Sequence, residues 1–256
     1  MKYKVFFDTN VLISASIMAA STDFEVKIEH PFAKISSNLL DFIKENIRKR
    51  IGIVTLYIED EAYFNLSRAV QSEISEGNEE RKIDFEIYSA IKNICDDRLR
   101  KYLGILSREP IDDFQVNIIG KHVEVMYDEL IQRACDIKRG LGSMVRTSAK
   151  RFRKMATSIY RNQDTLLNAQ LLNLIDSPAE YSDMKILAQA KYLLDLYKQT
   201  EGRDVDFYIA SCDYHFSPVK RGGFISRQVT DKIFNEFDIK CNFPDEVLNI
   251  LKQNIR

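Results

Sequence analysis

The first line of the sequence joins a short apolar strand directly to a polar triplet and then to a helical pattern. Residues 4–7 have the pattern of the strand, Asp8-Thr9-Asn10 follow it, and residues 11–17 have helical spacing. In an α/β chain, a carboxylate at the carboxyl end of a strand stands where the crevice of the sheet opens and ligands bind. A second strand, residues 207–211, also runs into an acid, Asp213. Two acids at two strand ends predict a metal site.

Strands separated by helices occupy both ends of the chain. A continuous β-branched run over residues 51–57 is typical of a buried parallel strand, and Glu59-Asp60-Glu61 open the helix after it. The strand that runs into Asp213 is expected to start near residue 205, and one more strand is expected from residue 238, with a helix between the two. The chain has only nine Gly and five Pro, which favours long helices over a loop-rich all-β fold. These patterns predict an α/β fold with a parallel, helix-covered sheet.

The middle of the chain has a different pattern. Residues 79–176 are overwhelmingly helical and too long for a simple crossover, so they are expected to form a helical insertion, with one strand near residues 123–126. Residues 1–78 and 177–256 are then the two parts of the α/β domain.

The cysteines and the apolar stretches bear on the compartment. The four cysteines are scattered without a Cys-x-x-Cys pair, which favours a reducing interior over a disulfide framework. The apolar N-terminal stretch is interrupted by Asp8 and Asn10, unlike a signal peptide, and no later stretch is long and apolar enough to span a bilayer. The expectation is a cytoplasmic protein without a membrane partner.

A third acid lies at the start of the helix that begins near Ser182. Asp183 precedes Ile186 and Leu187 by three and four residues, so it shares their inward face. An inward acid needs a partner, which suggests a site. The alternative is that Ser182 is the N-cap and that Asp183 only complements the helix dipole.

Four short motifs in order resemble those of the PIN-domain nuclease family. They are Asp8-Thr9-Asn10 after the first strand, Glu61 opening a helix, Asp183 in Asp-Met-Lys-Ile-Leu-Ala-Gln-Ala, and Asp213 in Ser-Cys-Asp-Tyr-His-Phe after a late strand. The resemblance covers both ends of the chain and leaves the helical middle without a counterpart. It implies a Rossmann-like sheet of about five parallel strands whose carboxyl ends gather three or four acids.

The resemblance also implies roles for individual residues. Asp8, Asp183 and Asp213 would be metal ligands, and Glu61 a ligand or the group that orients the attacking water. Asn10 would support Asp8 or a metal-bound water, and Ser211 would support Asp213. His215 is interpreted as part of the packing of its loop and is left outside the catalytic set.

A basic stretch is the expected contact for nucleic acid. The formal net charge is −1, so a nucleic-acid site must be a local patch. Between Asp136 and Asp164 there are eight Lys or Arg and no acid. This imbalance suits a phosphate backbone, although a solvated helix face is the other interpretation. The residues expected to bind RNA are Arg146, Lys150, Arg151, Arg153 and Lys154, with Lys220 and Arg221 near Asp213.

The function implied by the resemblance is a metal-dependent endoribonuclease that hydrolyses RNA phosphodiester bonds with Mg²⁺ or Mn²⁺ at a carboxylate-lined site. Single-stranded or looped RNA is the expected substrate. The alternative is a catalytically silent PIN-fold scaffold that binds RNA or a protein. Members of the family often pair, so a homodimer is one expected assembly, and an antitoxin or a ribonucleoprotein is another expected partner.

Overall fold

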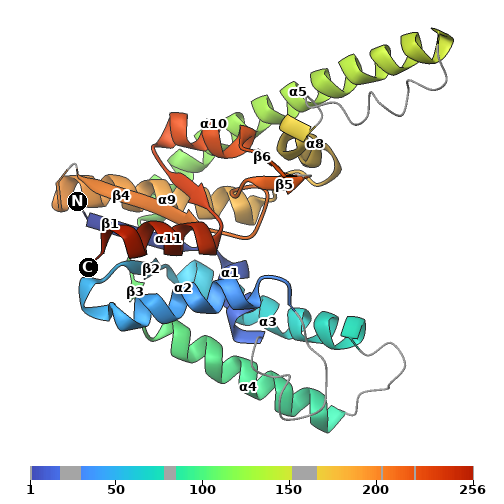
Figure 1. Cartoon of the computed structure of the whole chain (residues 1–256). Coiled ribbons are helices and arrows are strands. Elements are labelled where there is room, and N and C mark those ends of the chain that lie inside the picture. The colour runs from blue at the N-terminus through green and yellow to red at the C-terminus, as the bar shows by residue number, and fades with distance from the viewer. Residues whose placement is uncertain are drawn as a thin grey trace. The chain divides into compact units, whose positions relative to one another are not determined.

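The computed structural model describes residues 2–17, 30–77, 85–151, 166–202, 204–221 and 223–255. The chain forms two compact units (Figure 1). The first, here the sheet unit, consists of residues 1–111, 196–212 and 242–256; the second, here the helical unit, consists of residues 112–195 and 213–241. Among the helices of the described ranges, none combines the length and the apolar character that crossing a bilayer requires.

A five-stranded sheet in the order β3-β2-β1-β4-β7 is the main feature of the fold (Figure 1). The strands are β1 (Lys2–Phe7), β2 (Gly52–Val54), β3 (Ser107–Arg108), β4 (Val205–Ala210) and β7 (Lys240–Asn242). β1 pairs in parallel with both β2 and β4, and β2 pairs in parallel with β3. The predicted α/β fold with five parallel strands flanked by helices is confirmed.

The order of the strands reverses beside β1, because β2 and β3 lie on one side of it and β4 and β7 on the other. Ligands of open α/β sheets bind outside the carboxyl ends of the strands at such a switch point. In the register, Phe7 is opposite Ala210, so the residues that follow, Asp8 and Ser211, leave the sheet next to each other.

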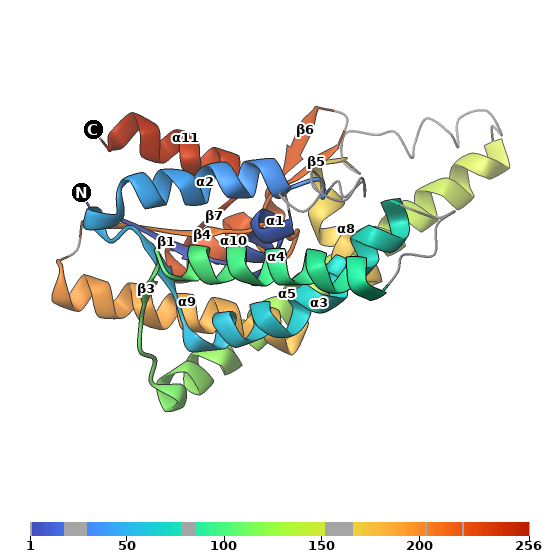
Figure 2. The same cartoon turned by 90° about the horizontal axis from the view of Figure 1, so that it is seen from below.

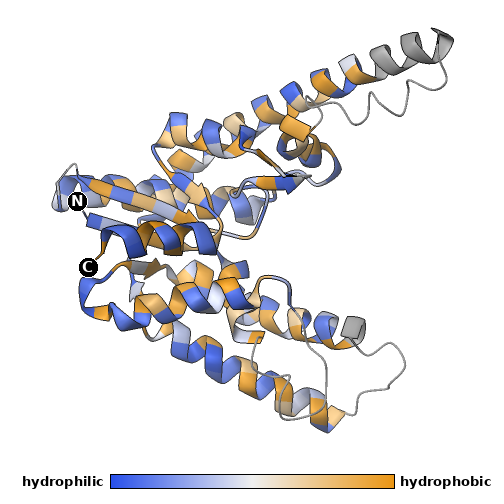
Figure 3. Cartoon of the chain, viewed as in Figure 1, coloured by the Kyte–Doolittle hydropathy of each residue, from blue (hydrophilic) through white to orange (hydrophobic). Residues whose placement is uncertain are grey.

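Helices of the sheet unit cover the strands. They are α1 (Thr9–Ile17), α2 (Ala33–Glu45), α3 (Leu56–Gly77), α4 (Phe85–Leu103) and α11 (Pro244–Asn254), with a short 3-10 turn, η1 (Ile47–Lys49). α1 is buried on almost all sides, because it packs against α2, α3 and α4. α2 and α11 run side by side (Figure 2). Figure 3 shows hydrophobic and hydrophilic residues alternating along α11, which buries one face.

Close packing around β2 explains its glycine. A Cβ on Gly52 would lie 2.6 Å from Leu106 Cδ2 and 2.9 Å from Ile43 Cγ2, distances that real Cβ atoms do not tolerate. β2 is also shorter than the β-branched run suggested, because Thr55 occupies the N-cap position of α3, with its Oγ1 3.5 Å from Ile58 N. α3 therefore starts at Leu56 and carries Glu61 in its second turn.

The sheet takes β3 from within residues 79–176, which the sequence analysis assigned to a helical insertion. The strand expected near residues 123–126 is wrong, because these residues belong to α5 (Asp113–Arg151). Val123, Met126, Tyr127 and Leu130 are buried at helical spacing, whereas Val125 is exposed. The helical period of the buried residues outweighs the local β-branched pair.

The helical unit consists of α5, α8 (Ala169–Asp176), α10 (Gln228–Phe237) and a two-stranded antiparallel hairpin, β5 (Val219–Arg221) and β6 (Phe224–Ser226). α8 packs against α5, α10 and β5. α9 (Tyr181–Thr200) begins in the helical unit and ends in the sheet unit.

Candidate metal centre

The carboxyl end of β1 holds the first predicted acid. Asp8 is only 4% exposed, and its Oδ2 accepts a hydrogen bond of 2.5 Å from Ser211 Oγ. The backbone N–H of Asp8 also donates to Ala210 O over 3.1 Å. The side chain of Ser211 therefore orients Asp8, and its expected support of Asp213 stays a prediction. The parallel register of β1 and β4 explains the contact with Asp8, since it brings residues 8 and 211 side by side.

Two further predicted residues lie at the same edge of the sheet. Thr9 Oγ1 donates a hydrogen bond of 2.6 Å to Glu61 Oε2, so Glu61 lies beside the end of β1. Asn10 Oδ1 accepts a hydrogen bond of 3.2 Å from the backbone N–H of Cys212. Glu59 instead pairs with Arg108 on β3. Of these two acids of the triplet, Glu61 is therefore the one that neighbours Asp8.

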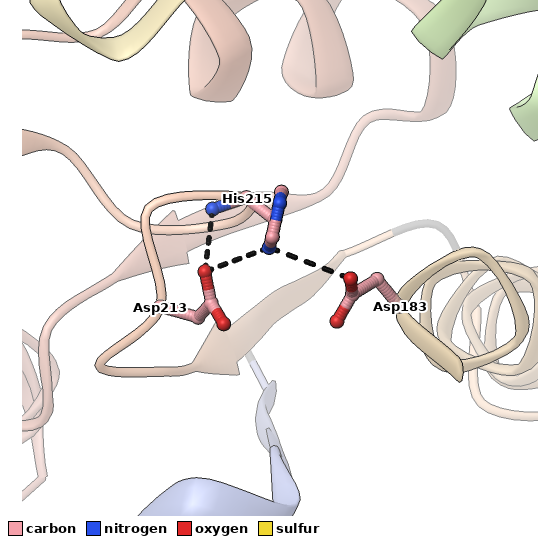
Figure 4. Close-up of side chains that lie close together, drawn as sticks. All are labelled: Asp183, Asp213 and His215. Atoms are coloured by element: carbon pink, nitrogen blue, oxygen red, sulfur yellow. Dashed lines mark hydrogen bonds and ion pairs between the residues drawn. The ribbon is translucent and has the colours of Figure 1, made fainter. Parts of the chain in front are cut away.

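The helical unit brings together Asp183, Asp213 and His215. His215 Nδ1 lies 2.8 Å from Asp213 Oδ1 and 3.4 Å from Asp183 Oδ2, and Figure 4 shows the ring between the two carboxylates. One potential ligand atom from each residue lies within 4.8 Å of the others. The side chains of His215, Asp183 and Asp213 are 6%, 15% and 31% exposed. The cluster is therefore sheltered, with Asp213 as its most accessible member.

Local backbone structure places both carboxylates. Asp183 is in the first turn of α9, and its Oδ2 accepts a hydrogen bond of 2.8 Å from Glu180 N, as the third helical residue does in a capping box. The alternative that Ser182 is the N-cap is wrong, because α9 begins at Tyr181 and Ser182 lies inside it. Asp213 forms a tight turn, in which its Oδ1 accepts from His215 N and its carbonyl accepts from Ser217 N. Each acid thus has a fixed orientation.

Three buried contacts hold the loop that carries Asp213 and His215. Gln170, which is fully buried on α8, donates from Nε2 to Tyr214 O and Ser217 O and accepts from Val229 N. Tyr127 OH donates to His215 O over 3.0 Å. A loop tied at this many points keeps its side chains in place, which is what a binding site requires.

The carbonyl oxygen of Ser177 receives two hydrogen bonds at the end of α8. Tyr214 OH donates to it over 2.6 Å, and His215 Nε2 lies 3.1 Å from it. A carbonyl oxygen can only accept, so Nε2 must carry the hydrogen. Nδ1, which faces the carboxylates, is then the atom available to a proton or a metal ion.

The electrostatics of the cluster are uneven. Burial raises the pKa of Asp183 to about 6, although the charge of His215 opposes the rise. Burial also favours a higher pKa for Asp213, but the nearby imidazole and backbone N–H of His215 outweigh it and lower that pKa. For His215, burial lowers the pKa while the adjacent Asp213 raises it, and the net direction is upward. The cluster attracts a cation and discourages ionisation of Asp183 without one.

The donor set fits a divalent cation. His215 Nδ1 is buried and has no hydrogen bond of acceptable direction to any described residue, although two carboxylates surround it. Two carboxylates and a neutral imidazole are ordinary ligands of divalent metals. The residues that would hold the ion are therefore Asp183, Asp213 and His215. That Asp8 and Glu61 share it stays a prediction.

The structure describes only part of the predicted RNA contacts. Lys220 is exposed on β5. The side chains of Arg146, Lys150, Arg151 and Arg221, and the whole of Arg153 and Lys154, lie outside the described residues. The predicted basic surface thus stays a prediction.

Sequence reasoning missed His215 and Gln170. His215 follows Asp213 by two residues, the spacing at which an Asp side chain binds the backbone N–H in a turn, and this signal could have linked the two. Gln170 gives no comparable signal, because its partners are backbone groups 44 to 59 residues away.

No protein-family model, curated protein or solved structure matches this chain. Inferences about its function therefore rest on the sequence motifs and on the geometry of the site.

Proposed function

We propose that this protein is a metal-dependent endoribonuclease of the PIN type, and that Asp8, Glu61, Asp183 and Asp213 are needed for its reaction. The observation that carries the proposal is the sheltered cluster in which Asp183 and Asp213 flank one ring nitrogen of His215. Such a group suits a divalent cation, because a bound cation would offset the burial that disfavours the ionised form of Asp183.

The carboxyl end of β1 gives further support. Asp8 is buried at the switch point of the sheet, where α/β proteins bind ligands, and Ser211 holds it in one orientation. Glu61 is fixed beside it through Thr9. Hydrogen-bonded, oriented carboxylates at such an edge can position a water or a cation.

The proposed roles follow from these contacts. Asp183 and Asp213 hold the cation, with Asp213 the more exposed and so the nearer to substrate. A bound divalent cation supplies Lewis-acid chemistry, which polarises a phosphoryl oxygen and makes water a better nucleophile at neutral pH. Asp8 and Glu61, which Ser211 and Thr9 hold in place, would bind a cation or orient the attacking water. The basic residues of the predicted RNA surface neutralise phosphate charge and give no base specificity.

The decisive experiment is a cleavage assay on a mixed pool of single-stranded and hairpin RNA with Mn²⁺ or Mg²⁺. We expect cleavage by the wild type that EDTA abolishes, and a fall of about 100-fold or more for Asp8→Asn and for Asp213→Asn. Asp97→Asn is the matched control, since Asp97 is exposed and pairs only with Arg100 among the described contacts. RNA binding by filter retention should survive in all three variants.

Two other outcomes are informative. Cleavage that persists in both Asp8→Asn and Asp213→Asn would mean that another site or a contaminant is responsible, and the proposal would fail. A wild-type protein that retains RNA on the filter but cuts no RNA in the pool would instead favour the silent scaffold.

A further inference from the structure

The tautomer of His215 is set by a backbone carbonyl. Because Ser177 O can only accept, the Nε2 atom 3.1 Å away carries the ring hydrogen. In the neutral ring, Nδ1 then presents a lone pair toward Asp213 Oδ1 at 2.8 Å and Asp183 Oδ2 at 3.4 Å. A cation between these three electron-rich atoms would offset the loss of hydration in this sheltered space.

The directions of these contacts distinguish a proton from a metal ion. A proton on Nδ1 would need an acceptor along the N–H direction, yet Nδ1 has no such partner among the described residues. In a metal site the ligand atoms lie off one another's axes, because each points at the ion. Two ligands about 2.1 Å from one ion and 90–109° apart are separated by about 3.0–3.4 Å. The separation of 3.4 Å between His215 Nδ1 and Asp183 Oδ2 lies in this range, and the 2.8 Å between Nδ1 and Asp213 Oδ1 is slightly shorter.

The contacts of the His215 ring resemble those of a metal-binding histidine. Such a residue usually donates its other ring N–H to a carbonyl or carboxylate, which fixes its tautomer and orientation. Here Ser177 O provides that acceptor, and Tyr127 OH holds the backbone carbonyl of His215 itself. The side chain of His215 is 6% exposed, so the ring nitrogen is not simply hydrated.

We infer that Asp183, Asp213 and His215 form a mixed nitrogen–oxygen site for a first-row transition-metal ion, that Nδ1 of His215 is a direct ligand, and that the site prefers Mn²⁺ to Mg²⁺. Imidazole is a ligand of transition metals, whereas Mg²⁺ is served by carboxylates, carbonyls and water. The inference concerns the ion of the proposed function and so rests on it for its role, but the binding itself can be measured without RNA.

The test measures Mn²⁺ and Mg²⁺ binding to the full chain by titration calorimetry. We expect Mn²⁺ to bind at least about 10-fold more tightly than Mg²⁺. His215→Gln should weaken Mn²⁺ binding about 10- to 100-fold and Mg²⁺ binding less than about 3-fold. His122→Gln is the matched control, since His122 is also in the helical unit but is exposed and lies near Glu236. It should leave both affinities unchanged.

A spectroscopic measurement on the wild type tests the same ligand without depending on the folding of a variant. Pulsed electron paramagnetic resonance of bound Mn²⁺ should show coupling to an imidazole ¹⁴N, and this coupling should disappear in His215→Gln. Bound Mn²⁺ without nitrogen coupling, equal affinity for the two ions, or no bound Mn²⁺ would overturn the inference.

The results also separate this inference from the proposed function. Nitrogen-coupled Mn²⁺ without RNA cleavage would uphold the metal site and refute the nuclease. Metal-dependent cleavage without nitrogen coupling would support the nuclease and refute His215 as a metal ligand.

Discussion

The Oγ atom of Ser211 donates a hydrogen bond of 2.5 Å to Oδ2 of Asp8, which joins the ends of β1 and β4 beyond the last backbone pairing of the two strands. Because Asp8 is buried, removing this donor leaves a carboxylate with less compensation for its lost hydration. The contact therefore matters for stability as well as for the orientation of the acid.

Ser211→Ala is expected to lower the free energy of unfolding by about 1.5–3 kcal/mol, the range for a hydrogen bond to a charged group. Urea denaturation measures the change. Ser16→Ala is the matched control, since Ser16 is equally buried but, among the described residues, bonds the carbonyl of Leu12 within α1, and alanine favours the helix. Equal losses in the two variants would refute a special role for the Asp8 contact.

Asp183→Asn should stabilise the metal-free protein at neutral pH. The pKa of Asp183 is about 6 in the folded chain against an ordinary 3.8, so the folded state binds more protons between these values, and its stability falls as the pH rises. Asparagine cannot ionise. The variant should therefore be more stable than the wild type by about 1–3 kcal/mol at pH 7.5 and lose this advantage at pH 4.

Asp213→Asn should change the free energy of unfolding in the opposite direction. The pKa of Asp213 is lowered, so its ionised form contributes stability that is present above its ordinary pKa and lost as the pH falls. The variant should be less stable than the wild type at pH 7.5, with the difference shrinking in acid. Urea denaturation in EDTA at the two pH values checks both variants, and changes of the same sign would contradict the described electrostatics.

Gln170→Leu should destabilise the fold by about 2–5 kcal/mol, because it leaves the carbonyls of Tyr214 and Ser217 and the N–H of Val229 without their buried partner. Thermal unfolding followed by circular dichroism measures the loss. Gln132→Leu is the control, since Gln132 contacts Asp136 on the exposed face of α5. A loss in Gln170→Leu no larger than in this control would show that the loop is held elsewhere.

Glu61 and Glu59 should differ in the cleavage reaction. Glu61→Gln is expected to reduce cleavage by about 10-fold or more, because Glu61 lies beside Asp8 through Thr9. Glu59→Gln breaks the pair with the half-exposed Arg108, its ion-pair partner in the described part of the chain, and should change cleavage less than about 2-fold. Initial rates on one RNA substrate compare them, and an equal effect would remove Glu61 from the proposed catalytic residues.

Neutralising Arg151, Arg153 and Lys154 together should weaken RNA binding and flatten its salt dependence. The slope of log affinity against log salt should fall in magnitude by about 2, since each lost phosphate contact on a single strand removes about 0.7. Filter binding across several salt concentrations measures the slope. The control neutralises three exposed residues of the sheet unit, Lys34, Lys44 and Arg48, and unchanged slopes in both would identify the stretch as a solvated surface.

The sequence was most informative where a pattern is local. The strand before Asp8, the β-branched run of β2 and the helices of both ends follow directly from apolar periodicity. The predicted strand near Val123 was wrong because two β-branched residues matter less than a helical face that continues over many turns. The pairing of β3 with β2 could not be predicted from the sequence, because the two residues of β3 are too few to show an alternation of apolar and polar side chains.

The site shows the same division between local and distant information. Asp183 on an inward helix face and Asp213 after a strand were visible as candidates in the sequence. That Ser211 contacts Asp8 depends on parallel register, which a single sequence does not encode locally. The place of His215 between two carboxylates depends on a turn and on a carbonyl 38 residues earlier.

That carbonyl belongs to Ser177, and its oxygen comes from the main chain. Any amino acid at position 177 offers the same oxygen, so the backbone, and not the side chain at this position, determines which nitrogen of His215 carries the hydrogen. A saturation mutagenesis experiment should therefore find position 177 tolerant and position 215 intolerant. Evolution could vary the first freely while the chemistry of the second stays fixed.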